Sequence, residues 1–406
     1  MLAEARTLLA GLPPAVRAVV AFYLIHLFFQ PKIAASEIAL ALALIAFGYA
    51  LAKRQIALAW SPLYPALLVY LAGSIVSALA APDPAASLLD LGEPLAFATL
   101  PIAASLYARE PRLAAWGFGT LCAMAASRSV QGIVQYATGG HEGLEHRITG
   151  GTTHVMTFSG ILLPIALATL ALAVDRRRWW QIAMAALTFS ALALTLTRSA
   201  WLGYAVGAAA IVLVRRIRWV PLIAALAILV VVLSPMAFFS RLVSSFDPKN
   251  SSNLDRIRMA QAGVEIIADQ PLFGIGPGNM KETYPLYRLP DAPRFRIPHL
   301  HSNPLQIWAE RGIVPLFGWL LLVGLAAREG VRLLRQGGER SSWGLAGLVA
   351  VVGLAIAGLF EFNFGDAEVT MNMLDVLAVA FAAAALPLAQ PLTQPRIENE
   401  ELRIER

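Results

Sequence analysis

Charged residues are scarce in this sequence. Only 14% of its 406 residues are Asp, Glu, Lys or Arg, whereas a soluble domain usually carries about 25%. Hydrophobic residues make up 58% and fall in long blocks, which argues against a soluble protein with a single core. The net charge of +6 does not indicate a nucleic-acid partner, because the basic residues lie at the ends of apolar blocks, where they set membrane topology.

Cysteine is almost absent. The single Cys122 excludes an intrachain disulfide, and its place in an apolar block gives no information about the redox compartment. A cleavage pattern of the Ala-x-Ala type is also missing after the first apolar run, so we expect that run to be a retained helix.

Apolar segments, by contrast, are abundant. A spanning helix needs roughly 20 mostly apolar residues, and about twelve segments come close to this length. The sequence therefore predicts an all-α, polytopic helical membrane protein. The predicted spans are 15–29, 33–52, 63–81, 86–107, 113–137, 154–174, 179–197, 199–214, 219–238, 303–327, 343–360 and 369–390.

Basic residues alternate between the two sides of these spans. Loops rich in Lys and Arg stay in the cytoplasm, which places both termini inside and one long loop outside. The short external loops hold only Lys32, Arg147 and Arg198. The cytoplasmic loops hold Lys53, Arg54, Arg109, Arg112, Arg176, Arg177, Arg178, Arg215, Arg216, Arg218, Arg328, Arg332, Arg335 and Arg340.

This topology divides the chain into four regions. We expect a membrane domain of about nine spans at 1–238, the long loop at 239–302, the last spans at 303–390 and a disordered cytoplasmic tail at 391–406.

The long loop carries its own signals. Residues 254–268 are typical of an amphipathic helix that begins after good N-cap residues and ends before Pro271. A glycine turn at 274–278 follows, and it lacks the spacing of a dinucleotide fingerprint. A basic, proline-rich stretch at 281–298 then leads to His299-Leu300-His301. The apolar face of the helix is expected to hold Leu254, Ile257, Val264 and Ile267.

Several polar residues lie in or beside the external halves of the predicted spans. Charge inside a bilayer is costly and marks a candidate functional site. A polar cavity open to the outside explains all of these positions together. The alternative is that their side chains snorkel to the membrane surface or form internal ion pairs. We favour this alternative for Glu93 or Asp366 when each is considered alone. The residues are Asp90, Glu93, Arg128, His154, Arg198, Glu361, Asn363 and Asp366.

Three motifs occur in a fixed order: Thr197-Arg198-Ser199, the glycine turn after Pro271, and a segment from Pro298 to Val314. This order resembles the superfamily of O-antigen ligases and O-antigen polymerases. In the ligase pattern a His is followed by Asn, Ser or Gln, nine residues and a Gly, and His301, Ser302 and Gly312 fit it. Pro315 departs from the Gly, Thr or Tyr that the family often has there.

The resemblance implies a transfer reaction on the periplasmic face of a Gram-negative inner membrane. The donor would be a polysaccharide on undecaprenyl pyrophosphate, and the acceptor a sugar hydroxyl of the lipid A–core. Enzymes of this kind are inverting, metal-independent glycosyltransferases of GT-C-like helical architecture, and no cofactor is implied. Membrane lipids are further expected partners.

The chemistry suggests roles for particular residues. A sugar hydroxyl needs a general base, and histidine suits that role, so we assign His301. Arginines can stabilise a pyrophosphate leaving group, so Arg198 and Arg288 are expected in catalysis. The remaining expected substrate-binding residues are Arg128, Arg294, Arg296, His299, Asn303 and Gly276.

Each role has an alternative. His299 and His301 form a His-x-His pair that could bind zinc with Asp291 or Glu310, although we expect no metal. His301 could instead cap the next span, and the glycine turn could only shape its loop. Arg294 and Arg296 could lie on anionic lipid headgroups.

Other functions also remain open at this point. A polymerase or a protein O-glycosylating transferase of the same superfamily would share these motifs. A secondary transporter would have a similar number of spans, but it would commonly show repeated halves with broken helices, and the sequence shows no such repeat.

Overall fold

The computed structural model describes residues 2–139, 147–215 and 250–383, and every regular element in these ranges is a helix. The predicted span 219–238, the start of the long loop and the tail 391–406 lie outside the described residues. The helices are α1 (Leu2–Ala10), α2 (Pro14–Phe29), α3 (Ile33–Ala52), α4 (Tyr64–Ala80), α5 (Pro84–Leu89), α6 (Glu93–Phe97), α7 (Thr99–Arg109), α8 (Leu113–Thr138), α9 (Val155–Arg176), α10 (Trp179–Leu194), α11 (Arg198–Arg215), α14 (Ser251–Asp269), α15 (Met280–Tyr287), α16 (Asn303–Arg311), α17 (Ile313–Leu334), α18 (Gly338–Ala357) and α19 (Ala367–Ala383).

Several of these helices have the length and composition of membrane spans. Within the described ranges, 5 helical stretches are long and apolar enough to cross a bilayer: α3, the stretch Pro84–Arg109, α9, α17 and α18. The shorter helices α2, α4 and α10 are also apolar. An all-helical fold of membrane type, as the sequence predicts, is therefore confirmed over the part of the chain that the structure describes.

Two predicted spans are interrupted. The span predicted at 303–327 is split between α16 and α17 at Gly312, and the span predicted at 86–107 is divided among α5, α6 and α7. Gly312 has φ +85°, and a Cβ there would lie 2.0 Å from the carbonyl oxygen of Leu272. The chain can therefore turn here only because this residue has no side chain.

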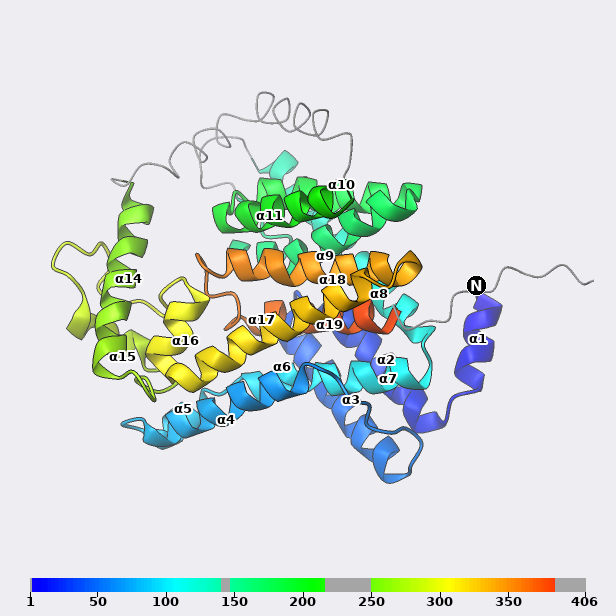
Figure 1. Cartoon of the computed structure of the whole chain (residues 1–406), viewed down its shortest axis with the longest axis horizontal. Helices are drawn as coiled ribbons and strands as arrows, with labels where there is room; N and C mark the ends of the chain where they lie inside the picture. Colours follow the sequence, from blue (N-terminus) through cyan, green and yellow to red (C-terminus); the bar gives the residue numbers. More distant parts are fainter. Residues whose placement is uncertain (1, 140–146, 216–249, 384–406) are drawn as a thin grey trace, which may run out of the picture.

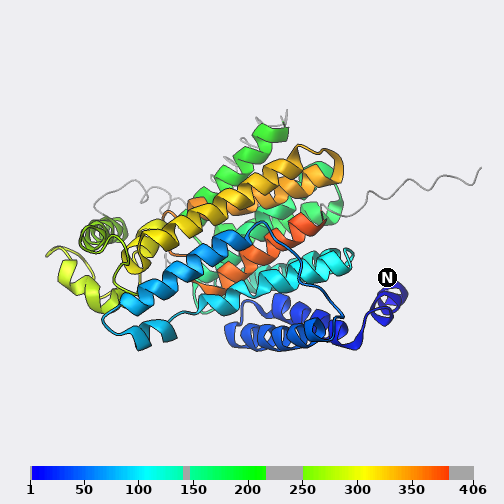
Figure 2. The same cartoon turned by 60° about the horizontal axis from the view of Figure 1, so that its bottom comes forward.

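The long helices lie side by side in one bundle (Figures 1 and 2). Helix α18 packs on α9, α11, α17 and α19, and α17 also packs on α4. Helices α11 and α18 approach closely, because a Cβ on Gly203 would lie 2.3 Å from the carbonyl oxygen of Gly353. Small residues at such crossings allow helix backbones to come together without a hydrophobic driving force from water.

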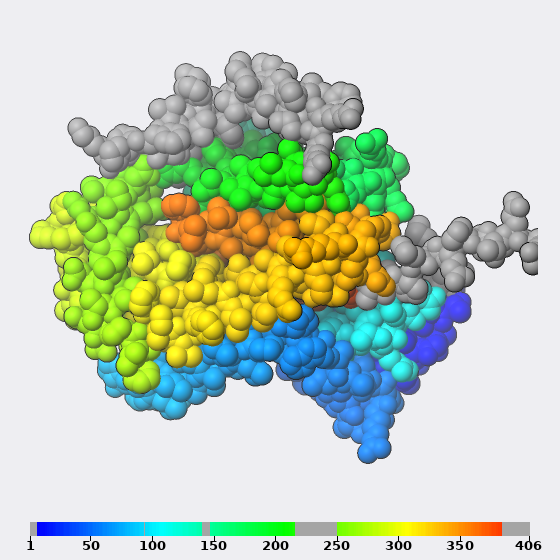
Figure 3. Space-filling view, in the orientation of Figure 1, coloured from blue at the N-terminus to red at the C-terminus, as the bar shows by residue number. Residues whose placement is uncertain are grey.

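The two ends of the bundle differ in charge. At one end α9, α11 and α18 are joined by ion pairs of Arg176 with Glu339 and of Arg215 with Asp175. At the other end lie α14, α15 and α16 (Figures 1 and 3), with α14 running across the bundle rather than along it. Arg176 and Arg215, two of the predicted basic-loop residues, thus lie at the end of the bundle opposite the long-loop helices (Figure 1).

The long-loop helices have a small core of their own. It joins α14, α15, the segment before His301 and α16 through Met259, Ile266, Tyr284, Ile297, Leu300 and Ala309. Helix α14 begins and ends where the sequence predicts, within a few residues. Two of the four residues predicted on its apolar face are not buried in the structure, since Ile257 and Val264 are 44% and 56% exposed. The face turned inward instead carries Gly263, where a Cβ would lie 2.7 Å from Leu300.

A carboxylate lies completely buried in the bundle, where the sequence reading had placed no functional residue. Asp375 of α19 accepts hydrogen bonds from the Tyr23 hydroxyl at 2.6 Å, the Gln30 amide at 2.6 Å and the Thr99 hydroxyl at 2.5 Å. The His26 ring lies 3.3 Å from the same carboxylate. Four partners from α2, α7 and the chain after α2 surround this one buried carboxyl group, which links the N-terminal helices to α19.

Candidate functional site

A polar cavity of about 980 Å³ opens at the end of the bundle where α14 to α16 lie. Its walls come from the start of α9, the chain between α18 and α19, the first residues of α19, α16 and the loop before it. The sequence had grouped several of these residues as external polar positions. The titratable residues that line it are Asp90, Arg147, His154, Lys281, Arg294, His299, His301, Glu310, Arg311, Glu361, Asp366 and Glu368.

His301 occupies a strained position in this wall. It has φ +53°, which few residues other than glycine adopt. The neighbouring residues stabilise this backbone conformation. The Leu300 N–H donates to the Gln306 side chain at 2.8 Å, and α16 begins directly after Ser302. Left-handed residues of this kind cluster at functional sites.

The His301 ring is oriented by Glu361. Nδ1 lies 2.8 Å from Oε1 of this carboxylate, which comes from the chain between α18 and α19. Burial raises the pKa of Glu361, but the hydrogen bond with His301, and the charge of Arg256 as a smaller cause, lower it, and the net result is a lowered pKa. An ionised Glu361 requires a proton on Nδ1 of neutral His301, which leaves Nε2 with a free lone pair.

His299 stands beside His301. The two ring centroids are 4.4 Å apart at 74°. Burial, with the charge of His301 as a second cause, lowers the pKa of His299 to about 4, so this imidazole is neutral at neutral pH. Ligand atoms of His299, His301 and Glu361 all lie within 4.8 Å of one another, and these three could hold a metal ion.

The acids suggested from sequence as partners for this histidine pair lie elsewhere. Asp291 bonds Arg258 at 2.5 Å. Glu310 accepts a hydrogen bond from the Gly278 N–H at 2.9 Å. Glu361, sixty residues after His301 in the chain, takes the place expected for them.

Cations line the cavity, and most were not assigned from sequence. Arg294 was expected, and it also pairs with Asp255 at 3.0 Å. Arg147 was noted only as a basic residue of an external loop. Its guanidinium donates to the Thr195 carbonyl and the Thr197 hydroxyl, both at 2.8 Å, so it connects the Thr-Arg-Ser motif with the cavity. Lys281 and Arg311 complete the set of lining cations.

The other expected arginines do not line the cavity. Arg288 donates to the Ala292 carbonyl at 2.9 Å and lies over the Phe295 ring, so it holds its own loop. Arg296 pairs with Glu282, and Arg128 bonds Gln131 on its own helix. Arg198 begins α11 directly after Thr197, the partner of Arg147.

The glycine turn is used to dock the loop on α16. The Gly276 N–H donates to the Glu310 carbonyl at 2.8 Å, and the Ile275 N–H donates to the Ala309 carbonyl at 3.0 Å. At Gly278, φ is +80° and a Cβ would lie 2.6 Å from a carboxylate oxygen of Asp90. These N–H groups have protein acceptors, so the geometry favours the loop-shaping role of the turn over phosphate binding.

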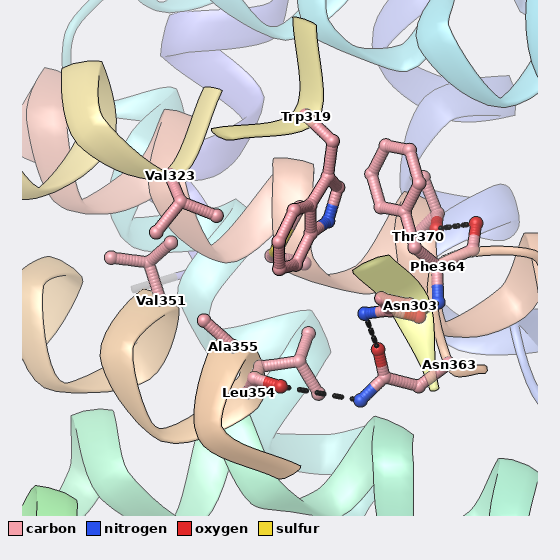
Figure 4. A pocket seen from close by; sticks show the side chains of 10 residues that line it. Asn303, Trp319, Val323, Val351, Leu354, Ala355, Asn363, Phe364 and Thr370 are labelled. Carbon is pink, nitrogen blue, oxygen red and sulfur yellow. Dashed lines mark hydrogen bonds between the residues drawn. The ribbon is translucent and has the colours of Figure 1, made fainter. Parts of the chain in front are cut away.

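Asn303 positions the site rather than lining it. Its side chain donates to Asn363 at 2.7 Å and accepts from the Phe364 N–H at 3.0 Å, which ties the start of α16 to the chain carrying Glu361. Figure 4 shows this pair beside Trp319 at a small cavity of about 10 Å³. That space is barely enough for one water molecule.

Helix α16 explains the spacing of the histidine and the glycine. The helix spans 9 residues, from Asn303 to Arg311, with His301 and Ser302 before it and Gly312 directly after it. Nine residues rise about 13.5 Å, so the spacing sets the distance between the strained histidine and the turn into α17. His301 and Gly312, the residues that flank this segment, both have positive φ angles.

Comparison with known families agrees with the sequence motifs. A family model described as O-antigen ligase matches residues 182–320, roughly a third of the chain. The match covers α10, α11, α14 to α16 and the start of α17, and so includes His301 and Gly312. The resemblance to the O-antigen ligase and polymerase superfamily is confirmed. No curated protein matches the chain at a significant level.

Proposed function

We propose that this protein is an O-antigen ligase. It would transfer a polysaccharide from undecaprenyl pyrophosphate to a sugar hydroxyl of the lipid A–core and so complete lipopolysaccharide. The observation that carries the proposal is the His301–Glu361 pair in a large polar cavity, with His301 inside the segment that matches the ligase family.

The charge distribution supports a cavity on the external side. Positive loops stay in the cytoplasm, and the ion-paired basic end of α9, α11 and α18 lies opposite the cavity. Both termini would then be cytoplasmic, and the site would face the periplasm of a Gram-negative cell. About twelve spans in a GT-C-like arrangement, with the four regions defined from the sequence, complete this proposal.

His301 would act as the general base. Nε2 takes the proton of the acceptor hydroxyl while the hydroxyl oxygen attacks the anomeric carbon of the donor sugar. The bond from that carbon to the pyrophosphate oxygen breaks, and its electron pair leaves with the phosphate. Glu361 holds the ring through Nδ1 and stabilises the imidazolium that forms. A single displacement of this kind inverts the anomeric centre.

The cavity cations would stabilise the leaving group. Arg147, Arg294 and Lys281 face the space where a lipid diphosphate can enter, and guanidinium groups bind phosphate by paired hydrogen bonds. Arg198 directly follows Thr197, which bonds Arg147, and it is proposed to support Arg147. With this positive charge in place, we expect transfer to need no divalent ion and to survive EDTA.

A strain that lacks this chain tests the proposal. Ligase function predicts lipid A–core without polymer and an accumulation of long lipid-linked polymer, both restored by the wild-type chain. Core carrying a single repeat unit would instead assign polymerase activity.

A further inference from the structure

His299, His301 and Glu361 converge on one point of the cavity wall. One ring nitrogen from each histidine and one carboxylate oxygen lie within 4.8 Å of one another. Two imidazoles and a carboxylate are a ligand set that zinc uses with an open fourth position. We propose that these three residues form a Zn²⁺ site and that the bound ion inhibits the transfer reaction. The inhibition rests on the function proposed above, whereas the site does not.

The backbone brings the three ligands together. The positive φ of His301 turns the chain so that the rings of residues 299 and 301 lie on the same side, with centroids 4.4 Å apart. Glu361 enters from the chain between α18 and α19, which Asn303 fastens to the start of α16. The segment that carries His299 and His301 and the segment that carries Glu361 are thus fixed relative to each other without a bound ion.

The ligand atoms have to adjust their separations to admit the ion. The His301 Nδ1 and Glu361 Oε1 atoms are 2.8 Å apart, whereas ligands about 2.0–2.1 Å from a tetrahedral zinc lie about 3.4 Å from one another. This pair therefore has to open by about 0.6 Å, while ligand atoms that lie up to 4.8 Å apart have to move closer to the same separation. The fourth position would open into the 980 Å³ cavity.

Neighbouring arginines make such a site reversible rather than structural. Arg256 lies 3.4 Å from the other Glu361 oxygen, and Arg294 also lines the cavity. Their positive charges repel a divalent ion. Zinc is therefore expected to bind and leave with its free concentration, unlike the closed four-ligand sites that fold small domains.

Bound zinc would remove the base whichever His301 nitrogen it takes. If the ion binds Nε2, it occupies the lone pair that accepts the proton. If it binds Nδ1, the ring carries its remaining proton on Nε2, which again has no lone pair. Transfer would stop in either case.

Zinc titration of the purified full-length chain tests the site directly. We expect one Zn²⁺ per chain by calorimetry, and visible absorption from Co²⁺ used as a probe ion. His299→Gln should weaken Zn²⁺ binding at least tenfold. His154→Gln is the matched control, because His154 lines the same cavity outside the cluster, and its zinc affinity should equal that of the wild type.

Equal zinc affinity in His299→Gln and wild type, or no saturable binding to the wild type, would overturn the site. The wild-type titration decides this even if His299→Gln fails to fold. Transfer by the wild type should fall as zinc saturates and return with a chelator. Saturable binding that leaves transfer unchanged would keep the metal site but contradict His301 as the base, so the two proposals fail separately.

Discussion

At the scale of single residues, the site depends on orientation more than on acidity alone. Glu361 lies 2.8 Å from Nδ1 of His301, a residue that lines the cavity. An ionised Glu361 would hold the proton of a neutral ring on Nδ1 and leave Nε2 as an acceptor. The same logic fixes the tautomer of catalytic histidines in other enzymes. A change at Glu361 should therefore act through the ring and not through substrate binding.

Glu361→Gln should lower kcat by about 10²-fold or more, with little change in KM, because an amide no longer enforces the Nδ1–H tautomer. Steady-state transfer kinetics measure both constants, and the pH profile should change with kcat. Glu329→Gln, at an exposed pair with Arg332, is the control and should behave as wild type. Wild-type kcat in Glu361→Gln would rule out this positioning role.

The buried imidazole of His299 predicts a pH effect on stability. Its pKa is about 4 in the folded chain and 6.5 ordinarily. Between pH 4 and pH 6.5 the His299 imidazole is protonated in the unfolded chain but neutral in the folded chain. The free energy of unfolding therefore decreases as pH falls from 6.5 towards 4. In EDTA, Tm should fall less from pH 7 to pH 5 in His299→Gln than in wild type. Identical falls in both proteins would refute this.

At the scale of helices, α16 is the element that builds the site. It places His301 at its start, Glu310 and Arg311 on the cavity wall at its end, and the glycine turn along its last carbonyls. The turn at Gly312 then sends the chain into α17. Changes at that junction should disturb every one of these contacts together.

Gly312→Ala should impair folding and transfer severely. A Cβ on this residue would meet the Leu272 carbonyl oxygen at 2.0 Å. Its backbone has φ +85° and ψ −174°, a conformation that is essentially restricted to glycine and adds about 1–3 kcal/mol for another residue. Gly324→Ala in α17 is the matched control, since a Cβ there would meet nothing within 4 Å. Tm and transfer rate are the readouts, and equal behaviour of the two variants would contradict the role of the turn.

The Asp375 network makes a prediction about helix association. Thr99→Val removes one donor from a buried carboxylate, which costs about 1–3 kcal/mol, and should lower Tm. Thr169→Val is the control, because the buried Thr169 hydroxyl bonds only carbonyls of its own helix. A Tm loss as large in Thr169→Val as in Thr99→Val would show that the network does not join the helices.

Local sequence signals predicted part of the fold and part of the candidate site. Capping types and Pro271 marked the bounds of α14. The His301–Gly312 spacing marked a family motif, but the sequence predicted a single span at 303–327 and did not predict that α16 ends at Gly312. Glu361 was predicted at the external polar cavity, but its pairing with His301 was not predictable, because the two residues lie sixty positions apart in the chain. Arg147 was not predicted at the site, because it stands in a short loop without a motif. Ile257 and Val264 of the predicted apolar face are exposed, whereas the inward face carries Gly263, which lies close to Leu300. The apolar pattern of α14 alone did not show which residues pack inward.

At the scale of the whole molecule, the two ends of the helical bundle carry different groups of polar residues. One end holds basic residues in ion pairs, and the other holds a polar cavity beside a small core formed by α14, α15 and α16. Apolar helices of spanning length connect them. A lipid-linked donor could thus reach the cavity from the bilayer while the acceptor sugar arrives from the water outside.

Transfer between purified lipids tests the central claim most directly. The full-length chain, reconstituted with undecaprenyl-pyrophosphate-linked polysaccharide and lipid A–core in EDTA, should yield polysaccharide joined to the core. His301→Ala should lower this rate by about 10²–10⁴-fold while inserting normally. Wild-type turnover in His301→Ala, or no ligated product from the wild-type chain, would contradict the account.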